Sequence, residues 1–221
     1  MVAGLPVSRR IGILGGGLMA TGLATLFTDA GHDVVISRRT PRRNDDDPAE
    51  VTSFAQAADH GDIVVLAITH AGVPAVTESL AHRLDGKVVI DITNSVVFKE
   101  GRLKSGLPDG ISEGEWMANL LPNARVTRAY NHIQDEMLVS RARRQPGIWG
   151  VAVAGDDAQA VEVTRELVGS TGFVPVNVGS LRASLVLDPG GPVFPHMFTP
   201  VDLADVLQSG APPRLPANEI S

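Results

Sequence analysis

The chain has 221 residues, a formal net charge of −6 and no cysteine. Hydrophobic residues make up 43% of it, which is enough for the core of one generous domain, or of one domain with a small annex. The acidic balance argues against a nucleic-acid-binding face, which needs an excess of Lys and Arg. The absence of cysteine excludes disulfides, thiolate metal sites and a cysteine nucleophile.

The segment "SRRIGILGGGLMATG", residues 8–22, allows two interpretations. It resembles the start of a twin-arginine export signal, but no small-x-small cleavage site follows, and glycines interrupt the apolar run. The alternative is a strand over 10–14, a glycine turn and a helix over 18–30. We favour the second interpretation, and we expect a cytoplasmic protein that contacts neither membrane nor nucleic acid.

Short β-branched runs alternate with helix-like stretches along the rest of the chain, which is typical of a parallel sheet covered by helices on both faces. The expected strands are 33–37, 62–68, 87–92, 125–130, 148–155 and 173–178. The expected helices are 50–60, 73–84, 114–123, 157–171, 180–188 and 201–209. No metal-ligand spacing and no internal repeat stands out.

This order predicts an α/β fold, a Rossmann-type doubly wound parallel sheet with a small C-terminal helical element. We expect an NADP-binding domain over 1–146 and a C-terminal strand–helix–strand extension with short helices over 147–209. That extension would complete the substrate pocket. Residues 210–221, rich in Pro and polar side chains, are expected to form a flexible tail.

The glycine turn carries the first functional signal. Gly15, Gly17 and Ala20 match G-x-G-x-x-G/A directly after a strand and directly before a helix. Gly15 allows the sharp turn out of the strand, and Gly17 lets the backbone approach a pyrophosphate. The helix N-terminus offers N–H groups and a partial positive charge to the phosphates. The alternative is a flexible loop that binds nothing, but the strand–turn–helix context favours a dinucleotide.

The residues after the second strand indicate NADP rather than NAD. An NAD enzyme usually ends this strand with Asp or Glu, which accepts hydrogen bonds from the ribose. Here Ser37 stands in that place, and Arg38, Arg39 and Arg42 follow it. Guanidinium groups bind phosphate through paired, charge-assisted hydrogen bonds, so this cluster favours a 2′-phosphate. Alternatively, the arginines only balance the aspartates at 45–47 on a solvated loop.

Several segments together resemble the family of F420-dependent NADP oxidoreductases: "IGILGG", "GHDVVISRR", "ADHGDIVVLAI", "VVIDITN", "RAYNHI", "VAGDDAQA" and "GFVPVNVGSL". The likeness covers roughly residues 9–190, and "DITN", "AYNHI" and "GDD" before a helix are its more telling parts. The resemblance implies a Rossmann domain, NADP as cofactor, coenzyme F420 as hydride partner and a homodimer.

The resemblance also implies roles for individual residues. The 2′-phosphate would be held by Ser37, Arg38 and Arg42, and the pyrophosphate would lie over Gly17, Leu18 and Met19. Thr69 and His70 would border the nicotinamide ribose. The nicotinamide ring would lie near Asn94, Ala129, Asn131 and His132.

Two departures from the family pattern stand out. The glycine turn is one residue shorter than usual, so the pyrophosphate loop is expected to be tighter. The segment "VLDPGGPVFPHMFTP" replaces a long apolar helix, which puts the second substrate in question rather than the cofactor.

Hydride transfer between two rings needs mainly positioning, whereas an imine or a ketone also needs a proton donor. We name His132 and Asn131 as candidate catalytic residues, with His70 as the second candidate donor. Alternatively, His132 only hydrogen-bonds a backbone carbonyl and shapes the pocket.

Three functions remain open. The first is hydride transfer between NADP(H) and F420 or a similar carrier. The second is NADPH-dependent reduction of a small metabolite, such as an imine, carbonyl or activated alkene, and the third is a non-catalytic NADP-binding module.

Overall fold

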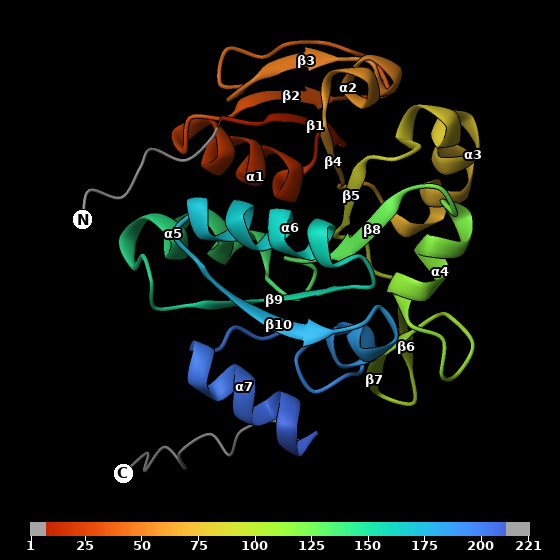
Figure 1. Cartoon of the computed structure of the whole chain (residues 1–221), viewed down its shortest axis with the longest axis vertical. Helices are drawn as coiled ribbons and strands as arrows, with labels where there is room; N and C mark the ends of the chain where they lie inside the picture. The colour runs from red at the N-terminus through yellow and green to blue at the C-terminus, as the bar shows by residue number, and fades with distance from the viewer. Residues whose placement is uncertain (1–7, 211–221) are drawn as a thin grey trace.

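The computed structural model describes residues 8–210. Its centre is an eight-stranded sheet (Figure 1). From one edge to the other its strands are β10 (Val174–Gly179), β9 (Gly150–Gly155), β8 (Arg125–Arg128), β5 (Val88–Asp91), β4 (Ile63–Leu66), β1 (Arg10–Leu14), β2 (Asp33–Ser37) and β3 (Glu50–Thr52). The strand order confirms the Rossmann-type α/β fold.

One pair of strands departs from the expected parallel arrangement. β8 pairs with β5 in parallel but with β9 in antiparallel, and β9 then pairs with β10 in parallel. Only the ends of β8 and β9 are paired, Thr127 with Gly155 and Arg128 with Ala154. β9 therefore extends past the carboxyl end of β8 and forms a wall beside that edge of the sheet.

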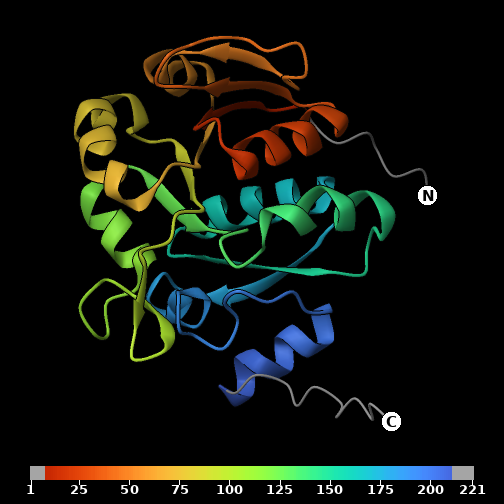
Figure 2. The same cartoon turned by 180° about the vertical axis from the view of Figure 1, so that it is seen from behind.

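Helices cover both faces of the sheet (Figures 1 and 2). One core cluster lies under α1 (Leu18–Asp29), α5 (Asp135–Arg144) and α6 (Ala158–Ser170). The second lies under α2 (Phe54–His60), α3 (Val73–Leu84) and α4 (Glu113–Leu120). The strands β1, β4 and β5 are buried and apolar except for the exposed Arg10 at the start of β1, Gly12 and Asp91, as burial on both faces requires.

The C-terminal part adds a third, smaller core. α7 (Pro200–Ser209) packs its Leu203 and Val206 against Ala152 of β9 and Val176 of β10. α7 and the hairpin of β6 (Val96–Lys99) and β7 (Arg102–Ser105) lie at the same end of the molecule in both views (Figure 2). The expected domain boundary at 146 falls within the continuous sheet and stays a prediction.

Most expected elements are present, and three differences have local causes. Residues 50–52 form β3 rather than the start of a helix, because β-branched Val51 and Thr52 extend beside β2. The helix starts after Ser53, whose capping box with Gln56 fixes its first residue. The expected helix over 180–188 is a short 3-10 turn, η2 (Arg182–Leu187).

The hairpin β6–β7 was not expected at all. Its four-residue strands are exposed or half-exposed and show no alternation of apolar and polar residues, so periodicity gives no signal. The expected tail lies outside the described residues, except for Gly210, which ends α7 in the left-handed conformation.

Candidate functional site

The glycine turn after β1 has the geometry that its pattern predicts. Gly15 has a φ of +144°, and a Cβ there would overlap the carbonyl oxygen of Ala67, so only glycine fits. Gly17 is different, because a Cβ at that position would meet nothing within 4 Å. The space in front of Gly17 is therefore open to a ligand, while the turn itself is closed against the neighbouring strand.

The N-terminus of α1 is left free by its own chain. In α2, α4, α6 and α7 a side chain caps the first turn by accepting a hydrogen bond from a backbone N–H. α1 instead begins after Gly17, which has no side-chain cap, and its first turn carries no acidic residue. Its first N–H groups and the positive end of its dipole are thus available to an anion.

Ser37 and Arg38 connect the end of β2 to this turn. The buried Ser37 hydroxyl donates to the carbonyl of Ile13 at 3.1 Å and accepts from the N–H of Gly15 at 3.3 Å. Ser37 therefore holds the turn, and it would have to release Ile13 to donate to a phosphate.

Arg38 extends beside the turn and forms a bidentate ion pair with Asp47, with Nη1 donating to Oδ2 at 2.7 Å and Nη2 donating to Oδ1. Nη1 also donates to the carbonyl of Arg42 at 2.6 Å. The hydrogen bond from Arg38 lowers the pKa of the Asp47 carboxyl. Because the carboxylate occupies the guanidinium fork, a phosphate bound by Arg38 would compete with Asp47.

These features meet at a cavity of about 590 Å³. It is bounded by the glycine turn, the residues after β2 and the start of α3, with an apolar wall between them. Its lining residues are Gly15, Gly16, Gly17, Ser37, Arg38, Arg39, Phe54, Ala67, Ile68, Thr69, Gly72, Ala75 and Val76.

Six of the expected site residues line this cavity: Gly15, Gly17, Ser37, Arg38, Arg39 and Thr69. Leu18 is 75% exposed at the start of α1, and Met19 packs partly against the core below. Arg42 is exposed, and its carbonyl rather than its guanidinium contacts Arg38.

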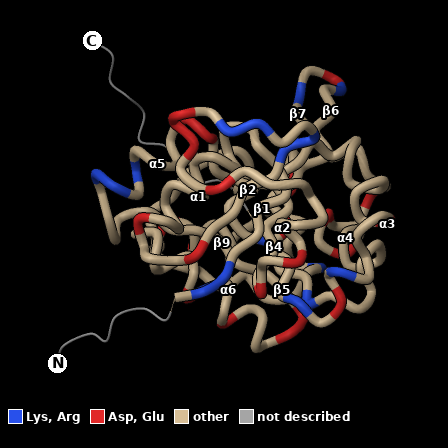
Figure 3. Tube along the Cα trace, turned by 90° about the horizontal axis from the view of Figure 1, so that it is seen from above, with Lys and Arg blue, Asp and Glu red and all other residues tan. Residues whose placement is uncertain are grey.

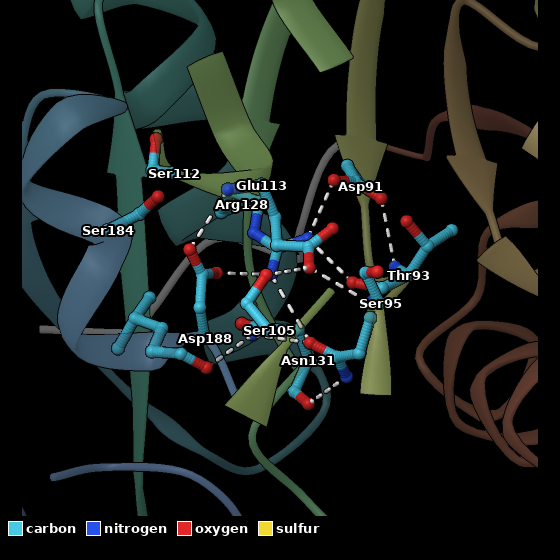
Figure 4. A network of polar contacts seen from close by, with 12 residues as sticks. Asp91, Thr93, Ser95, Ser105, Ser112, Glu113, Arg128, Asn131, Ser184 and Asp188 are labelled. Atoms are coloured by element: carbon cyan, nitrogen blue, oxygen red, sulfur yellow. Dashed lines mark hydrogen bonds and ion pairs between the residues drawn. The ribbon is translucent and has the colours of Figure 1, made fainter. Parts of the chain in front are cut away.

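A second polar cluster lies at the carboxyl ends of β5 and β8 (Figure 4). At its centre is Arg128, which is 0% exposed. Its guanidinium pairs with Asp91 at 2.6 Å and with Asp188 at 2.9 Å, and it donates to the carbonyl of Thr93 at 2.7 Å. Asp188 also accepts from the backbone N–H of Glu113. The cluster thus fastens the segment after η2 to the edge of the sheet.

Asn94 and Asn131 belong to this cluster. Asn94 Nδ2 donates to the carbonyl of Asn131 at 2.8 Å, and Asn131 Nδ2 donates to the carbonyl of Leu187 at 2.8 Å. Asn94 Oδ1 accepts from Arg128. Asn131 Oδ1 is buried without a hydrogen-bond partner. It is therefore the one polar side-chain atom of this asparagine that is left without a partner.

The arrangement around His132 does not support its candidate role as proton donor. The ring is fully buried, Nδ1 lies 3.0 Å from the carbonyl of His196, and Nε2 accepts from the N–H of Ala152. Burial lowers the pKa of His132 to about 4. The imidazole ties β9 to the C-terminal segment, so a structural role, as in the alternative interpretation, agrees better with these contacts. Ala129 is likewise buried in the core rather than in an open site.

His70 lies next to the cavity-lining Thr69, in the 3-10 turn η1 (His70–Gly72). Its ring stacks on Trp116 of α4, with centroids 4.4 Å apart and planes at 25°. Its Nδ1 is 3.4 Å from Oε2 of Glu113, and its side chain keeps 24% exposure. Burial lowers the pKa of His70 and raises that of Glu113.

Sequence reasoning missed four charged residues of this cluster, Asp91, Glu113, Arg128 and Asp188. A signal was present in "KVVIDI" and "RVTRAY", where Asp91 ends an apolar strand and Arg128 is the last residue of its strand. In the described part of the chain no group of three or more His, Cys, Asp or Glu side chains is arranged to hold a metal ion. No helix within residues 8–210 is long and apolar enough to cross a membrane.

Comparisons with known proteins agree with this geometry. Residues 10–95 match the family described as NADP oxidoreductase coenzyme F420-dependent. The F420-dependent NADP reductase of Methanocaldococcus jannaschii is 26% identical over 136 residues, 60% of each chain. The structure of a putative F420-dependent NADP reductase from Arthrobacter sp. FB24 is 26% identical, with a TM-score of 0.70 over 81% of this chain and 90% of that one.

A further relative is a metalloreductase. Metalloreductase STEAP3 of Rattus norvegicus is 30% identical over 178 residues, which are 79% of this chain but 35% of that protein. The chain spans about a third of the length of the metalloreductases that it matches.

Proposed function

We propose that the chain transfers hydride between NADP(H) and coenzyme F420 or a similar acceptor, because residues 10–95 match the family of F420-dependent NADP oxidoreductases and two similar proteins carry that name. The observation that carries this proposal is the 590 Å³ cavity, where a glycine turn, an uncapped helix end and two arginines meet.

The residues present fit a phosphorylated dinucleotide. The open space at Gly17 admits a pyrophosphate, which the free N–H groups at the start of α1 would bind. Arg38 and Arg39 would hold the 2′-phosphate, and the absence of a carboxylate at the end of β2 removes the group that would repel it. Ile68, Ala75 and Val76 offer an apolar wall to the adenine. When bound, the reduced nicotinamide supplies the hydride.

The acceptor half of the proposal rests on the comparisons. F420 is favoured by the family and by the names of two similar proteins. The chain's own contribution would be to hold two rings together and exclude water, for which the wall formed by β9 and the segment after η2 is available.

The test is the oxidation of NADPH by purified protein in the presence of coenzyme F420. The loss of F420 absorbance monitors the reaction. Reduction of F420 that is faster with NADPH than with NADH supports the proposal. NADPH oxidation by a cyclic imine or ketone but not by F420 would replace the acceptor with a small metabolite. Saturable NADPH binding without turnover of any of these acceptors would indicate a non-catalytic module. Absence of NADPH binding would overturn the proposal as a whole.

A further inference from the structure

The buried cluster at the end of the sheet contains more carboxyl groups than cations. Arg128 is one cation, and Asp91, Asp188 and Glu113 are three carboxyls that are all almost fully buried. Asp91 and Asp188 pair with the guanidinium, but Glu113 does not. A third buried negative charge without a partner would be costly, so the cluster favours binding one more proton.

The additional proton would lie between the side chains of Glu113 and His70. Glu113 Oε1 accepts from the Ser95 N–H and the Ser105 hydroxyl, both at 2.9 Å. Its other oxygen, Oε2, and His70 Nδ1 are buried atoms without a hydrogen-bond partner, and they lie 3.4 Å apart. A proton between these two atoms would satisfy both of them at once.

The imidazole is fixed and has one nitrogen left free. Stacking on Trp116 sets the plane of the ring. Nε2 makes no hydrogen bond within the described residues and is not among their buried polar atoms without a partner, so it stays open to solvent. The charged groups that act on the ring from the neighbouring elements are Glu113 of α4, Asp91 of β5 and Arg128 of β8.

We propose that His70 and Glu113 share one proton and that His70 delivers a proton from Nε2 to the second substrate as the hydride arrives. This inference rests on the proposed function, since it concerns the acceptor of that same reaction. His70 would be the proton donor, and Glu113 would be a positioning residue that acts through it.

The step balances as follows. The acceptor gains the hydride at carbon, and its π-electron pair moves to a nitrogen or oxygen, which takes the proton from His70 Nε2. Nδ1 takes the proton shared with Glu113, so the imidazole ends neutral and Glu113 ends as a carboxylate. The cofactor leaves as NADP⁺, and the pair regains one proton from water before the next turnover.

The other candidate donors are less well placed. Both ring nitrogens of His132 are bonded to the backbone, and the buried Tyr130 hydroxyl lies 3.1 Å from that of Thr171 inside the core. Neither side chain can reach a substrate without breaking the packing, whereas His70 already has an open nitrogen.

NMR titration of the histidine side chains tests the pair without any acceptor. His70 signals are assigned in the NADP⁺ complex by comparison with His70→Gln. We expect Glu113→Gln to lower the pH at which His70 titrates by roughly one unit, because the carboxylate that stabilises the imidazolium is removed. His70 titrating identically in wild type and Glu113→Gln would overturn the shared proton.

Turnover with F420 tests the delivery. His70→Gln should lower kcat by about 100-fold or more while the Kd for NADPH changes little. In Glu113→Gln, kcat should fall with rising pH at a lower pH than in the wild type. His82→Gln, at an exposed position on α3, is the matched control.

The two proposals can fail separately. If the wild type reduces F420 and His70→Gln has the same kcat, His70 is not the proton donor, and the proposed function is unaffected. A wild type that binds NADPH but does not reduce F420 would remove the acceptor, and the NMR titration alone would then decide on the pair.

Discussion

Arg38 is the residue on which the preference for NADP depends most directly. It lines the cavity, and its guanidinium is fixed by Asp47 rather than disordered in solvent. Fixing the fork in advance reduces the entropy lost when a phosphate binds. The same carboxylate competes with that phosphate, so Asp47 both orients Arg38 and limits its affinity.

Arg38→Ala should weaken NADPH binding by about 2 kcal/mol, roughly 30-fold in Kd, because a charge-assisted hydrogen bond to phosphate is lost. NADH, which lacks the 2′-phosphate, should be affected little. Calorimetric titration of both cofactors measures the difference, with the exposed Arg43→Ala as control. Equal loss for NADPH and NADH would place the 2′-phosphate elsewhere.

Substitutions at Gly15 and Gly17 should have different effects, the first on the stability of the fold and the second on NADPH binding. Gly15→Ala should lower the free energy of unfolding by at least about 2 kcal/mol, because its φ is left-handed and the methyl would overlap Ala67. Gly17→Ala should fold normally, since its methyl points into open space, but should bind NADPH more weakly. Urea unfolding and NADPH titration of both variants check this. A lower free energy of unfolding in Gly17→Ala than in Gly15→Ala would contradict these roles of the two glycines.

At the scale of elements, α3 and α1 both start at the cavity without a side-chain cap, and α1 follows directly on the glycine turn. A cap there would stabilise the helix, and its absence leaves the N–H groups to a ligand instead.

Gly17→Asp tests whether the first N–H groups of α1 are left free for a ligand. The carboxylate should cap α1 and raise the free energy of unfolding by a few tenths to about 1 kcal/mol. It should also abolish NADPH binding, because a negative charge then stands where the pyrophosphate would lie. Thermal unfolding and titration on one sample measure both effects. Retained binding in this variant would show that the phosphates lie away from α1.

The elements that the sequence predicted are those with strong local patterns. "RIGIL", "DVVIS" and "IVVL" are mainly apolar strands, and Asp157 caps α6. The β6–β7 hairpin lacked such a pattern because it buries little.

The same distinction applies to the site. The glycine turn and Arg38 could be found because consecutive residues form them. The cluster of Asp91, Glu113, Arg128 and Asp188 could not, since four distant segments meet there only in the fold. The strand β9 was expected, but nothing in the sequence indicated that it pairs with β8 in antiparallel.

For the molecule as a whole, Figure 3 shows Lys and Arg interspersed with Asp and Glu along the chain trace. The homodimer and the cytoplasmic location stay predictions. The stability of the whole fold, by contrast, can be related to particular buried groups.

His132 should make stability fall in acid. Its pKa is lowered to about 4 from 6.5, so the folded state binds fewer protons than the unfolded state between these values. Stability from this group is complete above pH 6.5 and decreases as pH falls toward 4, by about 3 kcal/mol. Glu113 and Asp188, whose pKa values are raised by burial, act in the opposite sense, losing stability as pH rises.

Urea unfolding of wild type and His132→Gln at neutral and acidic pH isolates this contribution. The variant should be less stable than wild type at neutral pH, and the gap should narrow as the pH approaches 4. His82→Gln should keep the wild-type pH dependence. A constant gap would mean that His132 does not carry the effect.

Calorimetric titration of the purified chain with NADPH and, separately, with NADH tests the central claim most directly. The arginines after β2 and the open start of α1 predict saturable binding of one NADPH per chain, at least about 10-fold tighter than NADH. No saturable heat with NADPH, or equal affinity for both nucleotides, would contradict the account.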